Sequence, residues 1–200
     1  MAVDREAVRP TPRRLPRAER REQILDAATR AFARAGYAAT GLNDIATEAG
    51  ITHVILYRHF ESKNDLYRAV LDRARARLAA TVGTDNYDDT SIPALLRAAA
   101  AEPDGFRLLF RFAAREPEFR DVVDSLRSAS TDIALRHLSA AIPQGPWRDW
   151  AALLVPTLTL EAVIAWLDAG QPDPDAAAGC VSQAIQGVIQ AAQGGAMSKG

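Results

Sequence analysis

The chain has 200 residues, of which 48% are hydrophobic, and its formal net charge is -1. This length allows one large domain or two small ones, with enough apolar side chains for a sizeable core. The single cysteine, Cys180, excludes an internal disulfide and favours a reducing cytoplasm. The N-terminus lacks the apolar core of a signal peptide, and no stretch approaches the roughly 18 uninterrupted apolar residues that a membrane span needs. We therefore expect a soluble, cytoplasmic protein.

Positive charge is concentrated at the start of the chain. Residues 1–68 contain 12 Lys and Arg against 9 Asp and Glu, whereas residues 69–200 contain 12 against 16. Residues 1–16 are expected to form a flexible basic arm. Two interpretations of it remain open: an arm that binds DNA phosphates, and a solvated tail kept disordered by its prolines. The arginines before residue 22 are Arg5, Arg9, Arg13, Arg14, Arg17, Arg20 and Arg21.

The first predicted helix begins near Pro16 or Arg17 and ends at Gly36. Proline is tolerated in a first helical turn, and glycine commonly follows the last one. Apolar residues repeat at helical spacing between these ends, and this stripe is expected to face the core. Its members are Ile24, Leu25, Ala28, Phe32 and Ala35.

Two short helices joined by a tight turn are predicted next. Gly50 supplies the left-handed residue that lets the chain turn sharply, and Thr52 caps the helix that follows. That helix is expected to bury Leu56 together with Ile51 and to turn outward His53, Val54, Tyr57 and Arg58. Such a helix-turn-helix places its second helix in the major groove of DNA.

A longer helix is predicted from its cap at Ser62 to about Val82, where Gly83 ends it. It is expected to link the first helices to the remainder of the chain. The following segment, Thr84 to Ser91, is rich in Asp and Thr and indicates a loop.

The remainder shows no alternating strand pattern, so the predicted fold class is all-α. Pro103 and Pro117 stand where helices begin. Pro156 falls inside a helical run, where it must free the carbonyl of Ala152 or delay the helix. The tail, residues 194–200, is expected to be loose. The predicted helices cover residues 92–101, 103–115, 117–142, 147–169 and 174–193.

The strongest signal lies between about Arg17 and Leu66, where a dozen or so positions fall in one register. They resemble the TetR family of transcriptional regulators. The resemblance implies a homodimer with a three-helix DNA-binding head, residues 17–62, and a larger helical body, residues 63–200, for effector binding and dimerisation. The segments that carry it are Arg21-Glu22, Ile24-Leu25, Ala27-Ala28, Phe32, Gly36-Tyr37, Thr40, Ile45-Ala46, Ala49-Gly50-Ile51-Thr52, Leu56-Tyr57-Arg58-His59-Phe60 and Ser62-Lys63.

By this resemblance, several polar residues hold the DNA backbone. Thr40, Tyr57 and Lys63 are expected to contact phosphates, and His59 is a candidate for a further contact. Thr52 belongs to the same surface as the cap of the recognition helix. Phosphate contacts of this kind set position without distinguishing sequences.

Base pairs would be distinguished by Asn43, His53, Val54 and Arg58. Arginine can pair with guanine through two hydrogen bonds, asparagine can do so with adenine, and valine can touch a thymine methyl group. The alternative for His53 and Arg58 is an exposed polar face without base contacts. Val54-Ile55 departs from the family pattern, which usually has small residues here, so a close main-chain approach to phosphate at this point is in doubt.

An effector cavity is suggested by aromatic residues of the body. Such side chains can line an apolar cavity with a few polar anchors, although a Phe and Leu stripe is also ordinary core. Arg107, Arg111 and Arg115 form a ladder that we expect to pair with Glu116 or Glu118 on a solvated face; a clamp for an anionic ligand is the alternative. The candidate effector residues are Phe106, Phe110, His137, Trp147, Trp150, Glu161 and Trp166.

The last two long helices carry more apolar surface than one body obviously hides. We expect it to form a two-fold interface, in which Gly187 allows close backbone approach; completion of the monomer core is the alternative. The stripe comprises Leu153, Leu154, Thr157, Leu160, Ile164, Trp166, Val181, Ile185, Val188 and Ile189.

The sequence predicts neither an enzyme nor a metal or cofactor site. It has no Cys/His cluster at metal-ligand spacing and no glycine loop that would cradle a phosphate. The expected function is that of a dimeric repressor, released from a palindromic operator by a small, largely apolar effector. The alternative is a helical ligand-binding or catalytic protein with a vestigial DNA-binding head.

Overall fold

The computed structural model describes residues 15–83 and 88–197, and within these ranges the chain is helical and contains no strand. The predicted loop at residues 84–91 falls partly outside them, as do most of the basic arm and the last three residues. The α-helices are α1 (Arg17–Ala39), α2 (Leu42–Glu48), α3 (His53–Tyr57), α4 (Lys63–Val82), α5 (Ser91–Ala101), α6 (Pro103–Arg107), α7 (Arg120–Leu138), α8 (Pro146–Asp168) and α9 (Pro174–Met197).

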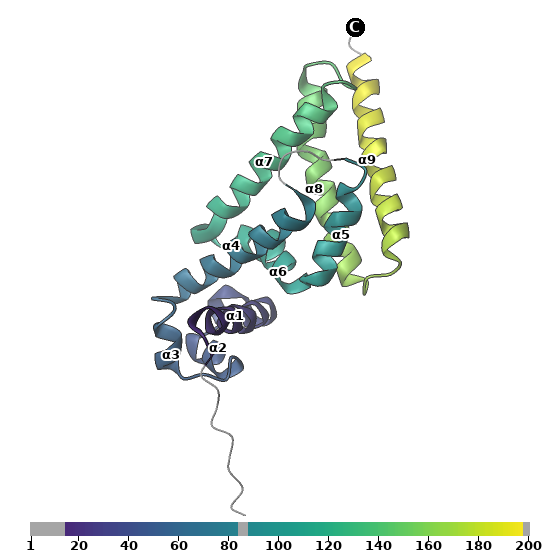
Figure 1. Cartoon of the computed structure of the whole chain (residues 1–200). Helices are drawn as coiled ribbons and strands as arrows, with labels where there is room; N and C mark the ends of the chain where they lie inside the picture. The colour runs from purple at the N-terminus through teal and green to yellow at the C-terminus, as the bar shows by residue number, and fades with distance from the viewer. Residues whose placement is uncertain (1–14, 84–87, 198–200) are drawn as a thin grey trace, which may run out of the picture.

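The described elements are all helices, which confirms the all-α prediction. These helices form two groups. Figure 1 shows α1, α2 and α3 together at one end of the molecule, and we call this group the head. Helix α4 runs from the head into a larger group, the body, made of α5 to α9 and the short turns between α6 and α7. Helices α8 and α9 pack side by side at the edge of the body.

Local signals place the ends of the head helices where the sequence predicts them. Gly36 has φ 80° and breaks α1 there, although helical turns resume up to Ala39. Gly50 has φ 64°, a conformation that costs glycine little, and it makes the turn between α2 and α3. The Thr52 hydroxyl accepts a hydrogen bond from Ile55 N at 3.4 Å, and the Ser62 hydroxyl accepts one from Asp65 N at 3.0 Å. These two bonds confirm the predicted caps of α3 and α4.

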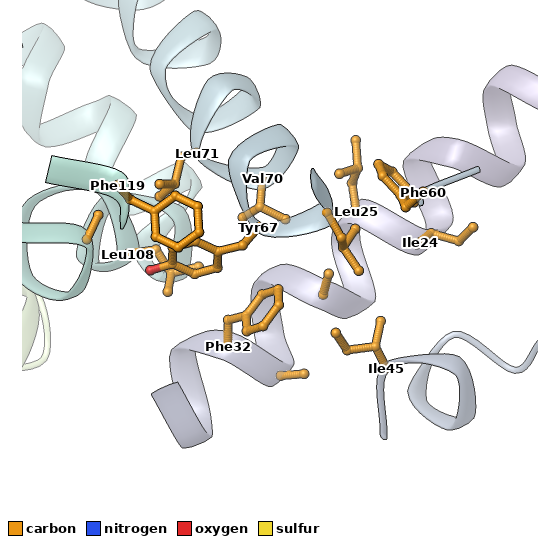
Figure 2. Close-up of a cluster of buried hydrophobic side chains, with 14 of the residues drawn as sticks. Ile24, Leu25, Phe32, Ile45, Phe60, Tyr67, Val70, Leu71, Leu108 and Phe119 are labelled. Carbon is orange, nitrogen blue, oxygen red and sulfur yellow. The ribbon is translucent and has the colours of Figure 1, made fainter. Parts of the chain in front are cut away.

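One hydrophobic core crosses from the head into the body. It joins Phe32 and Ile45 of the head to Tyr67 and Leu71 of α4 and to Phe119 near the start of α7. Figure 2 shows these side chains where the helices meet. Head and body therefore share buried apolar contacts, whose loss is costly because interiors are close-packed.

The segment predicted as one helix over residues 103–115 changes pitch instead. Helix α6 ends at Arg107 and is followed by a π-helical turn, η1 (Leu108–Phe112), and a 3-10 turn, η2 (Ala113–Arg115). Phe106 packs in a body cluster with Trp166, whereas Leu108, Leu109 and Ala113 pack in the core shared with the head. A wider turn shifts the later side chains relative to the earlier ones, which suits a segment that faces two cores.

Two other predicted elements differ at their ends. The helix expected from residue 117 begins as a 3-10 turn, η3 (Pro117–Phe119), before α7, and α7 stops at Leu138. Ile142 then folds back, with its N–H bonded to the carbonyl of Leu138 at 2.9 Å, and is buried. The C-terminal residues up to Met197 belong to α9, so the expectation of a loose tail is wrong for residues 194–197.

Helix α8 is long and apolar enough to cross a membrane by length and composition alone. Within the described ranges it is the single helix of this kind, and 44% of its most apolar window is buried in the molecule. This is weak evidence for a membrane span, because a core helix gives the same pattern. Its continuous helix passes through Pro156, so this proline does not delay the start of α8.

Candidate nucleic-acid interface

The recognition helix α3 presents an apolar and basic face to solvent. Leu56 is fully buried beneath it, while Val54 and Tyr57 are 63% and 49% exposed. Arg58, which follows the last turn, is exposed too. The sequence predicted that Leu56 would be buried and that Val54, Tyr57 and Arg58 would be exposed. The apolar side chain of Val54 and the guanidinium of Arg58 are therefore accessible to a ligand.

Two of the polar candidates on this face, His53 and Tyr57, are in contact. The rings of His53 and Tyr57 are 4.5 Å apart and nearly perpendicular. Asn43, in the first turn of α2, is exposed. Ile55 is half-buried and donates its N–H to the Thr52 cap. That bond already engages the main chain at the point where a close approach to phosphate was in doubt.

Lys63 is anchored rather than free. Its ammonium donates to the carbonyls of Tyr37 and Ala38 at 2.9 and 3.4 Å and lies 4.4 Å from the centre of the Tyr37 ring. An ammonium has three donors, so one remains for an incoming oxygen atom. These contacts also hold the start of α4 against the end of α1.

Thr40 is placed differently from the phosphate contact that the family resemblance implied. It is buried, and its hydroxyl donates to the carbonyl of Gly36 at 2.7 Å and lies 3.3 Å from that of Ala31. The hydroxyl therefore closes the end of α1 and is not presented to solvent. Its burial depends on how α1 ends after Gly36, which spacing along the sequence does not reveal.

The first turns of α1 bring arginines to the end of the recognition helix. Arg21 lies 4.3 Å from the centre of the Phe60 ring and donates to the carbonyl of His59 at 3.4 Å. Partial burial, and the positive charges of Arg17, Arg21 and Arg20, lower the pKa of His59 below its ordinary value. The sequence had grouped these arginines with the arm, but the structure puts them beside α3.

The arginines of the head fall into two groups. Arg30 and Arg34 both bind Glu48, at 3.0 and 2.6 Å. Arg17, Arg20, Arg21 and Arg58 form no ion pair with a carboxylate in the described part of the chain. The unpaired charges thus gather near α3, as a surface for nucleic-acid phosphates requires.

Comparison with known proteins agrees with this geometry. Residues 24–70 match the family described as bacterial regulatory proteins, tetR family. The chain is 33% identical over 194 residues to the HTH-type transcriptional activator FasR of Mycolicibacterium smegmatis. The alignment covers 91% of this chain and 85% of FasR. The chain belongs to the TetR family. It is a helix-turn-helix, DNA-binding transcriptional regulator.

Two further similarities support the assignment. The HTH-type transcriptional repressor Rv3405c of Mycobacterium tuberculosis is 32% identical over 140 residues, which are 66% of this chain and 73% of that protein. A TetR-like transcriptional regulator from Rhodococcus sp. RHA1 superposes with a TM-score of 0.74 at 24% identity, over 86% of this chain and 97% of that one. Because the second identity is low, it shows the fold alone.

The predicted effector residues do not gather around one cavity. Phe106 and Phe110 have ring centres 4.8 Å apart, and Phe106 shares a core cluster with Trp166, whose Nε1 donates to the carbonyl of Pro172. Trp147 and Trp150 meet at the start of α8, with ring centres 5.8 Å apart. The side chains of His137 and Glu161 are exposed on α7 and α8.

A small cavity nevertheless lies beside Phe106. Its volume is about 60 Å³, and its lining is formed by α4, α5, α6 and Leu109. A more polar cleft of about 120 Å³ lies between α1 and the junction of α5 and α6. The two share Ala101 and Glu102.

The arginine ladder pairs differently from the prediction. Arg107 and Arg111 both bind Asp168 at the end of α8, at 3.0 and 2.7 Å, and they hold the pKa of this carboxyl below its ordinary value. Glu118 instead accepts a hydrogen bond from Asn64 of α4 at 2.7 Å. The packing of α8 against this segment determines which carboxylate the arginines bind, and this packing cannot be inferred from the spacing of charges in the sequence. In the described ranges no group of His, Cys, Asp and Glu could hold a metal ion.

Proposed function

We propose that two copies of this chain bind a palindromic operator through paired α3 helices. The exposed face of α3, with Val54, Tyr57 and Arg58 above buried Leu56, carries the proposal. Asn43, His53, Val54 and Arg58 are proposed to contact bases, and Tyr57, His59 and Lys63 to contact phosphates. The unpaired arginines at the start of α1 add phosphate contacts beside His59.

The two-fold interface is proposed to form from α8 and α9. Leu153 is 57% exposed on α8, and a Cβ added at Gly187 of α9 would meet no atom within 4 Å. Exposed apolar surface and open helix backbone suit close packing of a second copy. The predicted stripe is narrower than expected, because Ile164, Trp166 and Val181 are buried in the monomer core.

The body is proposed to bind a small, largely apolar effector in the cavity beside Phe106. At about 60 Å³ the cavity holds few atoms, so an effector would have to widen it. A ligand can shift the protein between two states only by its difference in affinity for them. If the widened state separates the heads from the roughly 34 to 36 Å spacing of successive major grooves, the ligand releases the operator.

The remaining assignments follow from the same arrangement. We propose repression as the output; the relatives are named both as activators and as repressors. Residues 1–16 are proposed as a basic arm, 17–62 as the DNA-binding unit and 63–200 as the effector and dimerisation unit of a cytoplasmic protein. The alternative, a catalytic or ligand-binding body with a vestigial head, requires a chain that does not bind DNA specifically.

The deciding experiment is selection of duplexes from a random pool by the full chain, followed by binding titrations in increasing salt. We expect a palindromic duplex, and a log-log salt slope of about -0.9 for each phosphate neutralised. Equal affinity for all duplexes would overturn the proposal. Native mass spectrometry of the purified chain then tests for a co-purified effector, and the identified compound should release the selected duplex.

A further inference from the structure

Besides its other buried core contacts, two groups of side chains hold helix α1 against α4 and the body. The first lies towards its C-terminal end, where the rings of Phe32 and Tyr37 lie 4.8 and 4.9 Å from that of Tyr67 on α4. The ring of Phe119, from the body, lies 4.6 Å from Tyr67 and 5.0 Å from Tyr37. Figure 2 shows Tyr67 and Phe119 side by side at this aromatic junction.

The second attachment is a cluster of charges along the N-terminal half of α1. Arg73 of α4 reaches Glu22 at 3.2 Å, Asp26 at 2.7 Å and the hydroxyl of Thr29 at 2.9 Å. These three partners stand four and three residues apart, so they follow one face of α1. The Arg73 side chain is only 11% exposed, while both carboxylates are about half exposed.

The charge cluster continues into the body. Arg77, one turn further along α4, lies 3.4 Å from Glu22 and pairs with Glu102, the residue between α5 and α6. We call Glu22, Asp26, Thr29, Arg73, Arg77 and Glu102 the α1–α4 charge cluster. It connects the head, the linking helix and the body in one chain of contacts.

The polar cleft and the small apolar cavity both border this cluster. The polar cleft is lined by Asp26, Thr29, Arg73 and Glu102, and the apolar cavity by Arg77 and Glu102. The aromatic junction, by contrast, is closely packed core. A change in the body near α6 can therefore reach the head through charged, partly solvated side chains as well as through the packed core.

We propose that Arg73 is a positioning residue that sets the angle of the head on the body, and with it the spacing of operator half-sites that the dimer accepts. This rests on the proposed function as a palindrome-binding dimer. The aromatic junction holds the C-terminal end of α1, and the buried side chains of Ile24 and Leu25 hold its N-terminal half in the core, so α1 can make only a small swing about the junction. The fixed fork of the Arg73 guanidinium, bound to two carboxylates and a hydroxyl, limits that swing.

The consequence for DNA follows from geometry. Successive base pairs are about 3.4 Å apart along the duplex, so a small swing of each head moves the preferred distance between half-sites by a whole base pair. Contacts within one half-site stay the same, because α3 and its side chains move with the head. Loss of the Arg73 contacts should therefore change spacing preference rather than base preference.

The test compares Arg73→Met with Arg75→Met in the full chain. Arg75 lies on the same helix, is half exposed, and among the described residues pairs with Asp72 of its own helix alone, at 3.8 Å. Both variants lose one positive charge, so a general electrostatic effect is common to them. The probes are the duplex selected by the wild-type chain and versions of it with the centre lengthened or shortened by one or two base pairs.

We expect Arg73→Met to weaken binding at the original spacing by about tenfold or more, and to bind another spacing as well or better. Arg75→Met should keep the wild-type spacing profile. An equal loss at every spacing, or an unchanged profile, would overturn the positioning role. If the wild-type chain selects no palindrome at all, the proposed function fails before Arg73 is tested.

Folding of the variants needs its own measurement, by circular dichroism and sedimentation. Loss of Arg73 leaves Glu22 and Asp26 half exposed and able to be hydrated, so Arg73→Met should fold. If it does not, Asp26→Asn combined with Glu22→Gln weakens the same contacts from the exposed side. That variant should broaden the spacing profile, and a wild-type profile from it would overturn the proposal.

Discussion

Arg58 and Lys63 lie on either side of the turn between α3 and α4, and their surroundings differ. Arg58 is exposed without an ion-pair partner in the described residues, whereas Lys63 is held by the carbonyls of Tyr37 and Ala38. A free guanidinium at the end of a recognition helix can reach a base edge. An anchored ammonium at a helix start suits a phosphate at a fixed place.

We predict that Arg58→Ala relaxes specificity at one position of each half-site, by about 1 to 3 kcal/mol of discrimination. Lys63→Ala should weaken selected and random DNA alike and reduce the salt slope by about one per head. Titrations against all single-base changes of the selected duplex distinguish the two. Equal losses at every position for Arg58→Ala would assign it to the backbone.

His59 gives the interface a dependence on pH. Its pKa is lowered in the free protein by partial burial and by Arg17, Arg21 and Arg20. The unfolded chain then binds the proton more readily, so this group's contribution to folding stability is present above the unfolded pKa of about 6.5 and is lost as pH falls through the lower pKa of the folded protein. A DNA phosphate beside the imidazole would raise the pKa of His59, because the negative phosphate favours the charged ring.

Operator affinity should therefore rise as pH falls from about 8 to about 6, by at most about tenfold per pH unit for each proton taken up. The charged groups that act on His59 are the three arginines of α1, with Arg58 and Glu61 nearby in the chain. His59→Gln should remove the pH dependence that His53→Gln leaves in place. Anisotropy titrations at matched ionic strength measure it, and an undiminished dependence in His59→Gln excludes His59.

At the scale of elements, the start of α8 and the end of α9 are locked by one close contact. Carbon atoms of the Trp147 ring would lie 2.5 to 2.8 Å from a Cβ added at Gly195, whereas nothing lies within 4 Å of one added at Gly194. Gln193 also donates to the carbonyl of Ala141 at 3.1 Å. The end of α9 is thus held in place by packing that only glycine permits at residue 195.

Gly195→Ala should lower the free energy of unfolding by about 1 to 3 kcal/mol, because the added methyl group overlaps the Trp147 ring. Gly194→Ala, one residue earlier, should change it little or raise it by less than about 1 kcal/mol, through better helix propensity. Denaturant unfolding at one fixed protein concentration compares them. Equal stabilities would mean that Trp147 moves aside at no cost.

The helix ends of the head and the turn after α6 show what could be predicted from the sequence. Gly50, Thr52 and Ser62 act on their immediate neighbours, so their local patterns were sufficient to place the turn before α3 and the starts of α3 and α4. Gly36 marks the break in α1, but the helical turns that continue to Ala39 were not predicted. The π-helical turn at Leu108 joins side chains that pack in two different cores, and the local sequence of the turn does not reveal this packing.

Long-range contacts limited the prediction of the site in the same way. Arg58, Tyr57 and Val54 could be assigned to the exposed face from helical spacing alone. The burial of Thr40 and the pairing of Arg107 with Asp168 depend on segments that meet only in the folded chain. The aromatic residues expected around an effector are divided among separate clusters for the same reason, since residue type does not reveal which helix faces meet.

At the scale of the whole molecule, the proposed dimer depends on surface that a single chain leaves open. On α9, Val188 and Ile189 pack against a core cluster of their own chain, so charges there would damage the monomer. Leu153 and Gly187 are better targets, because both are exposed and the space around a Gly187 Cβ is empty. Glutamate at residue 187 is also a better helix former than glycine.

We therefore predict that Leu153→Glu combined with Gly187→Glu gives a folded monomer that no longer binds the palindrome. Repeated by the two-fold axis, the substitutions place four carboxylates in one desolvated interface, where like charges are costly. A single head then meets only one half-site and loses the affinity supplied by the second. Ser128→Glu with Ala129→Glu adds the same charge to exposed positions of α7 and should remain a dimer. Sedimentation gives the oligomeric state and circular dichroism the helix content. A dimeric Leu153→Glu, Gly187→Glu protein would place the interface away from this surface of α8 and α9.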